Sequence, residues 1–426
     1  MPLQPRGNTK LLKDSNPGAV IVGAGIGGCA LALALHQVGV RSRILESAPE
    51  IKPLGVGLNL LPHAVRDLAQ LGLEDQIAGN GIPTKELCFY TSLGQQIYVE
   101  PRGRFAGYKW PQISIHRGDL HAVLIDAVRQ RLGYDAIALG HRCVGVEQDA
   151  GGATVHLADP DGRPLPDVRG SFVVCCDGVH SVARESMHPN EAVPRYEGTT
   201  QYRGVTRWKS FLSGASMVYF GVKETGKLII YPIRDNVDAE GHQLVNWVIE
   251  VVRPRDLLLR NWNRKSRVEE FIHHFEHCSF DWLDIPAVLR ANDAVYEYPM
   301  VDQDPLPFWT TGRITLLGDA AHPMMPRGSN GAAQAIIDAT TLARLLASAS
   351  DPAGALKEYE ALRLAATANV VLANRGIAPD GIISVVEERT RGRPFKSIED
   401  VMPREELKRW QDRYRDVAGF ALDRMQ

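Results

Sequence analysis

Three glycines, Gly23, Gly25 and Gly28, stand between a short apolar run at 19–22 and an Ala/Leu-rich segment. The run is typical of a buried parallel strand, and the segment is typical of a helix. In such a turn the first glycine permits the tight bend, the second lets the backbone approach a pyrophosphate, and the third lets helix and strand pack closely. The free N–H groups of the helix N-terminus then face the phosphates. The chain is therefore expected to open with a Rossmann-like, dinucleotide-binding unit.

An acidic residue, Glu46, ends the next predicted strand at 43–46, 18 residues after Gly28. A carboxylate at this place can accept hydrogen bonds from a ribose. A tight glycine turn without any ligand is the alternative explanation, but strand, helix and acid together favour dinucleotide binding. The loop alone does not distinguish NAD from FAD.

Two further acidic turns follow predicted strands. Gly318-Asp319-Ala320-Ala321-His322-Pro323 comes after the apolar run at 313–317, and Cys176-Asp177-Gly178 comes after the run at 172–174, with Arg184 beyond it. Asp319 can bind a ribityl or ribose hydroxyl. The glycine-rich turn at 326–331 offers backbone N–H groups to an electron-rich ring carbonyl.

In their order and spacing these motifs resemble those of the FAD-dependent aromatic monooxygenases of the para-hydroxybenzoate hydroxylase type. The similarity covers about residues 18–375. Within that family, stretches such as PLGVGLNLLP and YPMVDQDPLPFW resemble the branch that acts on phenazine carboxylates. The resemblance implies one FAD per chain and an α/β fold: a Rossmann-like FAD-binding domain of the glutathione-reductase type, an inserted antiparallel-sheet substrate domain and a helical C-terminal region.

Apolar spacing along the chain agrees with this organisation. A helix is expected over 117–132, and a helical region over 331–374 with a break at 351–352. Strands near 144–146, 155–157 and 172–174 are expected to return to the parallel sheet. We expect a flexible arm at 1–17 and a discontinuous FAD-binding domain at 18–80, 105–187 and 306–350. The substrate domain is expected at 81–104 and 188–305, and a C-terminal helical region at 351–426.

The resemblance also assigns residues to roles. FAD is expected to be held by Gly23, Gly25, Gly28, Glu46, Arg117, Val144, Asp177, Asp319, Gly328, Asn330 and Gly331. Asp177 is expected to serve nicotinamide handling as well, in a region shared with Arg184. The residues expected to act in catalysis are Arg203, Tyr231 and Pro326.

Two of these assignments, and two further candidate residues, have structural alternatives. Arg203 can bind a substrate carboxylate or contact the flavin, and a surface salt bridge is the alternative. Tyr231 and Trp247 can line an aromatic pocket, or they can be ordinary core residues. His322 is expected to be a packed, hydrogen-bonded histidine.

The implied chemistry belongs to the flavin. NADH or NADPH reduces it, O₂ adds at the C4a carbon, and the hydroperoxide transfers one oxygen atom to an aromatic or N-heteroaromatic acid. A nicotinamide dehydrogenase is the first alternative, and the Gly318-Asp319 motif argues against it. A flavin halogenase is the second, but none of the seven tryptophans forms its W-x-W-x-x-P signature. A non-catalytic flavin protein, or another FAD-dependent oxidoreductase, stays open.

Composition excludes several other classes. The 426 residues carry 48 basic and 50 acidic side chains, a balance that gives no reason to expect nucleic acid as a partner. No run of about 18 apolar residues predicts a membrane span. Six cysteines without a C-x-x-C pair suit a reducing, cytoplasmic setting without disulfides. A monomer or homodimer is expected. His273, His274, His277 and Cys278 have helical i, i+4 spacing, but no third ligand is fixed. An amphipathic helix is expected there, and no metal site.

Overall fold

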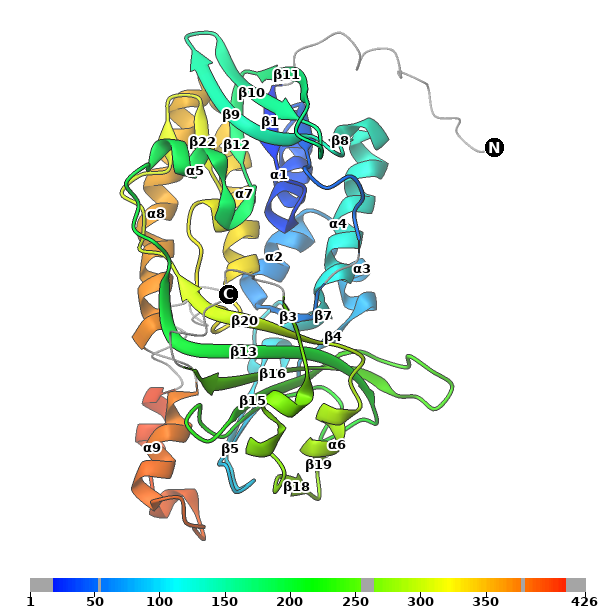
Figure 1. Ribbon diagram of the computed structural model, residues 1–426, viewed down its shortest axis with the longest axis vertical. Coiled ribbons are helices and arrows are strands. Elements are labelled where there is room, and N and C mark those ends of the chain that lie inside the picture. The colour runs from blue at the N-terminus through cyan, green and yellow to red at the C-terminus, as the bar shows by residue number, and fades with distance from the viewer. Residues whose placement is uncertain (1–17, 53–54, 254–263, 377–379, 411–426) are drawn as a thin grey trace.

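A computed structural model of the chain describes residues 18–52, 55–253, 264–376 and 380–410 (Figure 1). The arm expected at 1–17 and the end of the C-terminal region, 411–426, lie outside the described residues. The fold is α/β, with a mainly parallel sheet covered by helices and a larger, mostly antiparallel sheet that crosses beneath it. None of the helices in the described parts of the chain is long and apolar enough to cross a membrane.

The mainly parallel sheet carries the predicted Rossmann-like unit. Its strand order is β21-β22-β12-β1-β2-β8, and only β21 runs antiparallel to its neighbour. The helices α1, α4 and α7 pack with it. Bounds are β1 Ala19–Val22, β2 Ser42–Leu45, β8 Ile137–Ala138, β12 Phe172–Cys175, β21 Thr310–Thr311, β22 Ile314–Leu316, α1 Ile26–Gln37, α4 Arg117–Leu132 and α7 Gly331–Leu346.

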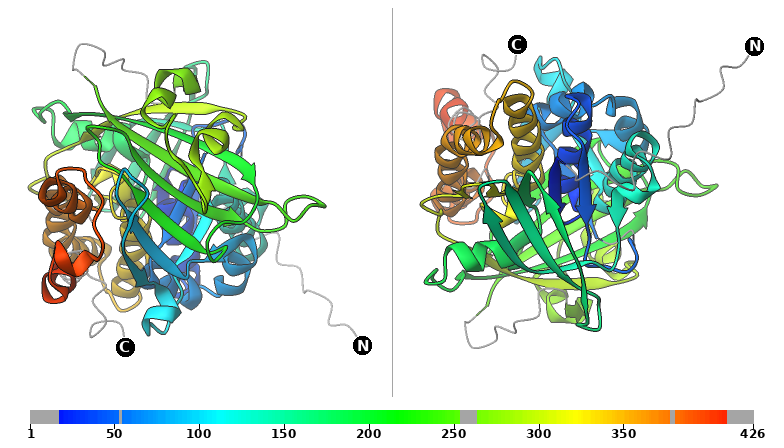
Figure 2. Two further views of the ribbon diagram at one scale, coloured as in Figure 1. Left: turned by 90° about the horizontal axis from the view of Figure 1, so that it is seen from below. Right: turned by 90° about the horizontal axis from the view of Figure 1, so that it is seen from above.

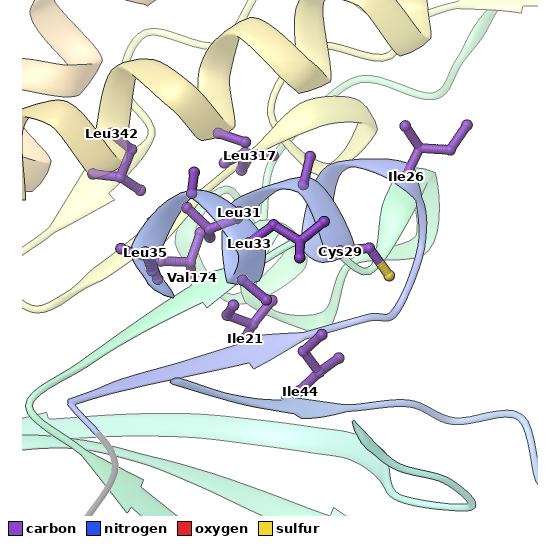
Figure 3. Packing of buried hydrophobic residues seen from close by; sticks show 14 of the residues in the cluster. Ile21, Ile26, Cys29, Leu31, Leu33, Leu35, Ile44, Val174, Leu317 and Leu342 are labelled. Atoms are coloured by element: carbon purple, nitrogen blue, oxygen red, sulfur yellow. The ribbon is translucent and has the colours of Figure 1, made fainter. Parts of the chain in front are cut away.

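The first helix is buried on nearly all sides, which explains its Ala/Leu composition. Leu31, Leu33 and Leu35 are fully buried and lie against Ile21 of β1, Val174 of β12 and Leu342 of α7 (Figure 3). A helix that is apolar all round has to be enclosed, because water would otherwise contact its hydrophobic surface. The enclosure holds the N-terminus of α1, and with it the glycine loop, at the carboxyl end of β1.

The second sheet has eight strands in the order β17-β20-β13-β16-β15-β14-β5-β6. Only the β14–β5 pair is parallel. Figure 2 shows this sheet spreading across one end of the parallel sheet. Bounds are β5 Glu86–Tyr90, β6 Gln96–Pro101, β13 Arg195–Trp208, β14 Ser216–Phe220, β15 Lys227–Arg234, β16 Gln243–Val252, β17 Arg264–Ser266 and β20 Val295–Asp302.

Two three-stranded sheets stand beside these. One consists of β3 (Gly57–Leu60), β7 (Ile113–His116) and β4 (Gly81–Pro83). The other consists of β9 (Arg142–Asp149), β10 (Gly152–Ala158) and β11 (Pro164–Gly170), all antiparallel. The prediction that strands near 144–146 and 155–157 return to the parallel sheet is therefore wrong, and only β12 joins it. Most of β9 is exposed or half-buried, whereas a parallel central strand is covered on both faces.

The helices that remain frame the sheets. They are α2 (Pro62–Gln70), α3 (Glu74–Asn80), α5 (Val182–Met187), α6 (Ile285–Arg290), α8 (Pro352–Gly376) and α9 (Gly381–Thr390). The predicted break at 351–352 is confirmed, since α8 begins at Pro352. Helix α9 packs through Ile382, Ile383 and Val386 against residues of the eight-stranded sheet.

The predicted helix around His273 is wrong. Two short 3₁₀ turns, at Val268–Glu270 and Ile272–His274, occupy the segment instead. Phe271 and Phe275 are fully buried and draw both turns onto the sheet, so the packing of these rings overrides the helical spacing.

All six cysteines are free thiols.

Candidate active site

A cleft of about 850 Å³ lies where the acidic turns of the parallel sheet face the eight-stranded sheet. Its lining contains every predicted site residue except Gly28 and Val144. From the predicted cofactor set it contains Gly23, Gly25, Glu46, Arg117, Asp177, Asp319, Gly328, Asn330 and Gly331, and from the predicted catalytic set Arg203, Tyr231 and Pro326. Three separate turns and one sheet face therefore converge on a single space.

The glycine loop has the geometry that its sequence predicts. Gly23 has a φ of +98°, and a Cβ there would lie 2.5 Å from the carbonyl oxygen of Cys176. A Cβ on Gly28 would lie 2.0 Å from the carbonyl oxygen of Gly23, so this glycine permits close packing and does not line the cleft. Gly25 differs from both, because a Cβ on it would meet nothing within 4 Å. The open space beside the Gly25 backbone fits a bound pyrophosphate.

Glu46 fixes the loop from the end of β2. Its Oε2 accepts a hydrogen bond from the backbone N–H of Ala24 at 2.8 Å, and its Oε1 accepts one from Ala48 N–H at 2.8 Å. The carboxylate is thereby held at the rim of the cleft. A carboxylate at this position has capacity left to accept a ribose hydroxyl.

Asp319 lies in the turn after β22 and is exposed to the cleft. The protein that surrounds the turn disfavours the charged form and raises the pKa of Asp319, and His322 and Arg117 oppose that shift.

Arg184 holds the turn that carries Asp319 through its guanidinium group, and it is only 3% exposed. Its Nη1 donates to the carbonyl oxygens of Ala320 at 2.9 Å and Ala321 at 3.2 Å. Arg184 does not line the cleft, and its place in a nicotinamide region shared with Asp177 stays a prediction.

Asp177 reaches the cleft from the other acidic turn. Its Oδ2 accepts a hydrogen bond from Val182 N–H at the start of α5, at 3.2 Å. Its Oδ1 is buried and has no hydrogen-bond partner among the described residues. Burial raises the pKa of this carboxyl group. An unpaired buried oxygen at a cleft wall fits a site that a ligand completes.

His322 has the packed, hydrogen-bonded role expected of it. Its Nε2 lies 2.6 Å from Oδ2 of the fully buried Asp338, whose Oδ1 accepts from Arg363 Nε at 2.7 Å. Asp338 Oδ2 also accepts from Gly318 N–H at 3.3 Å. The group joins α7 and α8 to the turn that carries Asp319.

The eight-stranded sheet supplies the opposite wall of the cleft. Register places Arg203, Val248 and Ile229 side by side on β13, β16 and β15, and all three line the cleft. Tyr231 lines it as well, and burial raises the pKa of Tyr231 to about 12. The guanidinium of Arg203 lies 5.9 Å from the ring centre of Tyr298. Its buried Nε has no hydrogen-bond partner among the described residues.

Trp247 does not line the cleft. Successive residues of a strand point to opposite faces, so Trp247 faces away from the side occupied by its neighbour Val248. It is fully buried beside Phe271, and its Nε1 donates to Thr206 Oγ1 at 3.0 Å. The core alternative is therefore the correct one for Trp247.

Comparison with known proteins gives the family. A family model described as "FAD binding domain" matches residues 18–271 and 291–374. Phenazine 1,6-dicarboxylic acid hydroxylase PhzS of Lysobacter antibioticus is 42% identical over 360 residues, which cover 84% of this chain and 88% of that protein. The chain belongs to the FAD-dependent aromatic monooxygenases. A further member, 3-hydroxybenzoate 6-hydroxylase 1 of Aquipseudomonas alcaligenes, is 31% identical over 369 residues, 82% of this chain and 86% of that one.

Solved structures share the fold of this monooxygenase. Klebsiella pneumoniae HpxO in complex with FAD and uric acid superposes with a TM-score of 0.71 at 23% identity and covers 96% of both chains. A salicylate hydroxylase in complex with its substrate has a TM-score of 0.69 at 22% identity, and the match covers 96% of this chain and 98% of that one.

Besides Gly28, one further predicted cofactor residue of the monooxygenase lies outside the cleft lining. Val144 is 47% exposed on β9, although the neighbouring residues 141–143 line the cleft. The outer sheet formed by β9, β10 and β11 turns this side chain toward solvent.

Several lining residues were missed by sequence reasoning. Counting in steps of two from Arg203 along the predicted strand would have found one of them, Gln201. The others include Asn59, Met217, Tyr219, Ile229, Val248 and Met324.

Proposed function

We propose that this monooxygenase hydroxylates the ring of an aromatic or N-heteroaromatic acid as a single-component enzyme. One ring C–H bond is replaced by C–O–H, O₂ supplies the inserted oxygen atom, and the other oxygen atom leaves as water. NADH or NADPH supplies the two electrons and is oxidised to NAD⁺ or NADP⁺. The observation that carries this proposal is the convergence of the cofactor turns and the Arg203–Tyr231 wall on one cleft.

FAD fits the turn side of the cleft. The open space at Gly25 suits the pyrophosphate, Glu46 suits a ribose, and Asp319 suits a ribityl hydroxyl. When bound, the reduced flavin activates O₂ and supplies an electrophilic oxygen equivalent. We assign Asp177 to the neighbourhood of the flavin and the nicotinamide, because the carboxyl group reaches the cleft with an unpaired oxygen.

The sheet side of the cleft suits a flat, electron-rich ring. Met217, Ile229 and Val248 give it an apolar surface that excludes water, and water has to be excluded for an electrophilic oxygen to reach the ring. Arg203 offers a guanidinium to a carboxylate, an interaction that is often bidentate. Tyr231 keeps its phenolic proton at neutral pH as any tyrosine does, and burial raises its pKa further, to about 12. Its hydroxyl can therefore donate a hydrogen bond.

The relatives support an acidic aromatic substrate. One is named as a phenazine 1,6-dicarboxylic acid hydroxylase, another as a 3-hydroxybenzoate 6-hydroxylase, and the 6-hydroxynicotinate 3-monooxygenase of Bordetella bronchiseptica is 29% identical over 357 residues. Every one of these names describes a ring that bears a carboxylate. The phenazine relative has the highest identity of the three, and it favours a fused N-heteroaromatic ring for this chain.

A substrate panel tests the proposal. Phenazine-1-carboxylate, phenazine-1,6-dicarboxylate, 3-hydroxybenzoate and 6-hydroxynicotinate are offered to the FAD-loaded enzyme with NADH or NADPH. We expect stimulated nicotinamide oxidation and a product heavier by one oxygen atom, labelled when ¹⁸O₂ is supplied. A flavoprotein that oxidises nicotinamide without oxygen transfer to any ring would contradict the proposal and favour another FAD-dependent oxidoreductase.

A further inference from the structure

Gln201 lies two residues before Arg203 on the cleft-facing side of β13. It is 1% exposed and belongs to the cleft lining. Register sets it beside Glu250 of β16, which in turn lies beside Lys227 of β15. The Gln201 Nε2 donates to Glu250 Oε1 at 2.7 Å, and Lys227 Nζ donates to Glu250 Oε2 at 2.7 Å.

This arrangement fixes the orientation of the Gln201 side-chain amide. An ionised carboxylate only accepts hydrogen bonds, so the amide has to present its NH₂ group to Glu250. Glu250 stays ionised because it is paired with Lys227, which also pairs with Asp380 at 2.7 Å. The carbonyl oxygen of Gln201 is thereby turned away from Glu250.

That carbonyl oxygen is buried and has no hydrogen-bond partner among the described residues. A buried acceptor that stays unpaired costs free energy, and such groups in native proteins call for a partner. Two residues along the same face, Arg203 presents a buried Nε donor that is likewise without a partner in the described parts of the chain. The strand thus offers an unpaired acceptor and an unpaired donor beside one cleft.

We infer that Gln201 is a specificity-determining residue that accepts a hydrogen bond from a hydroxyl or ring N–H group of the substrate. The inference rests on the proposed function, and it narrows the substrate class. The ring acid carries a hydrogen-bond donor near the carboxylate that Arg203 binds. A site built around a buried acceptor discriminates against analogues without the donor, because the acceptor is then left unpaired.

Matched ligand pairs test this on the FAD-loaded enzyme. The pairs are 6-hydroxyphenazine-1-carboxylate with its methyl ether, 3-hydroxybenzoate with 3-methoxybenzoate, and 6-hydroxynicotinate with 6-methoxynicotinate. Dissociation constants come from the change that each ligand causes in the flavin absorbance, so no turnover is needed. For the pair that fits the cleft, we expect the hydroxy acid to bind about tenfold more tightly than its methyl ether.

Gln201→Met then shows which residue causes the preference. This variant is expected to abolish the tenfold difference and to leave the methyl ether with about the affinity that it has in the parent enzyme. Gln243→Met is the matched control. Gln243 is a glutamine of the same sheet and is 4% exposed, and its Oε1 has no hydrogen-bond partner within the described parts of the chain, but it does not line the cleft. The control variant is expected to keep the preference.

The possible outcomes are distinct. Equal affinity for the two members of every binding pair in the parent enzyme would overturn the role of Gln201 without any variant, and the proposed function would stand. An equal loss for both members in Gln201→Met would mean that the residue only supports the sheet, and a water molecule would then be the partner of its oxygen. No binding by any of these acids would contradict the proposed function itself.

Discussion

Arg184 donates a hydrogen bond from Nη1 to the carbonyl oxygen of Ala320 at 2.9 Å and so ties helix α5 to the turn that carries Asp319. The two segments are far apart in sequence. The same guanidinium pairs with Glu191 through Nε at 2.7 Å, and Nη2 reaches the other oxygen of that carboxylate. The buried side chain of Arg184 therefore fixes the position of the turn that carries Asp319 relative to the turn that carries Asp177.

Replacement of Arg184 by Met is expected to destabilise the fold by about 3–5 kcal/mol, because it leaves Glu191 without its buried partner. FAD binding is expected to weaken as well, since the Asp319 turn loses its support. Thermal unfolding and FAD titration of the apoprotein measure the two effects. Arg163→Met, at an exposed turn, serves as the control and is expected to change neither quantity. If FAD binds Arg184→Met as tightly as the parent, the arginine supports the fold but not the cofactor turn.

Replacement of Asp319 by Ala is expected to weaken FAD binding by about 1.5–3 kcal/mol, which is roughly ten- to a hundredfold, through loss of a charge-assisted hydrogen bond. The pKa of Asp319 is raised by its surroundings. FAD affinity should therefore be complete above that raised pKa and fall as the pH drops through it, while the carboxyl group takes up a proton. Flavin release followed by fluorescence across the pH range checks this. Asp319→Asn should show no such pH dependence, and a parallel fall in that variant would remove the ribityl role.

Replacement of Asp177 by Ala is expected to slow flavin reduction more than it weakens FAD binding. The carboxyl group reaches the cleft, whereas the hydrogen bond that it accepts from the backbone N–H of Val182, at 3.2 Å, anchors only the start of α5. Anaerobic stopped-flow reduction by NADH or NADPH gives the rate, and apoprotein titration gives the FAD affinity. An unchanged rate would leave the turn with a structural role only.

Replacement of Arg203 by Ala is expected to raise the Michaelis constant for a ring acid by roughly ten- to a hundredfold. The Michaelis constant for the matching ring amide should change little, because the amide has no charge for the guanidinium to pair with. Steady-state oxidation of NADH or NADPH with both compounds makes the comparison. Similar losses for acid and amide would indicate a flavin contact or a structural role.

Replacement of Asp338 by Asn is expected to lower stability at neutral pH by about 3–5 kcal/mol, since Arg363 and His322 lose a buried partner. Burial opposes ionisation of Asp338, but His322 and Arg363 outweigh it and lower its pKa. A lowered pKa stabilises the fold above the ordinary carboxyl value of about 3.9, and this contribution is lost as the pH falls through the lowered value. Urea unfolding between pH 3 and pH 7 should thus show a smaller acid loss in the Asn variant than in the parent. A steeper acid loss in the variant would contradict the pairing.

Features that depend on neighbouring residues could be predicted from the sequence. The glycine loop, helix α4 at 117–132 and the strand before Asp319 follow from local spacing and turn chemistry, and the structure confirms them. The parallel β14–β5 pair could not be predicted, because it joins residues 86–90 to 216–220 and only three-dimensional packing decides such a pairing. The side of the sheet that faces the cleft is likewise a tertiary property. For that reason Trp247 was weighed as a pocket residue and Gln201 was missed.

The alternation along β13 has a consequence for how this enzyme can change over generations. Positions 201, 203 and 205 lie on the face turned to the cleft, while 202, 204 and 206 lie on the opposite face, where Tyr202 and Gly204 lie against the rings of Phe271 and Trp247. If the proposed substrate contacts are right, we expect mutations at 201 and 203 to change which substrates the enzyme accepts, and mutations at the even positions to change mainly its stability. On the proposed function, substrate range and thermal stability would then depend on nearly separate sets of positions along a single strand. A gene library randomised only at the odd codons should yield mostly folded proteins with new preferences.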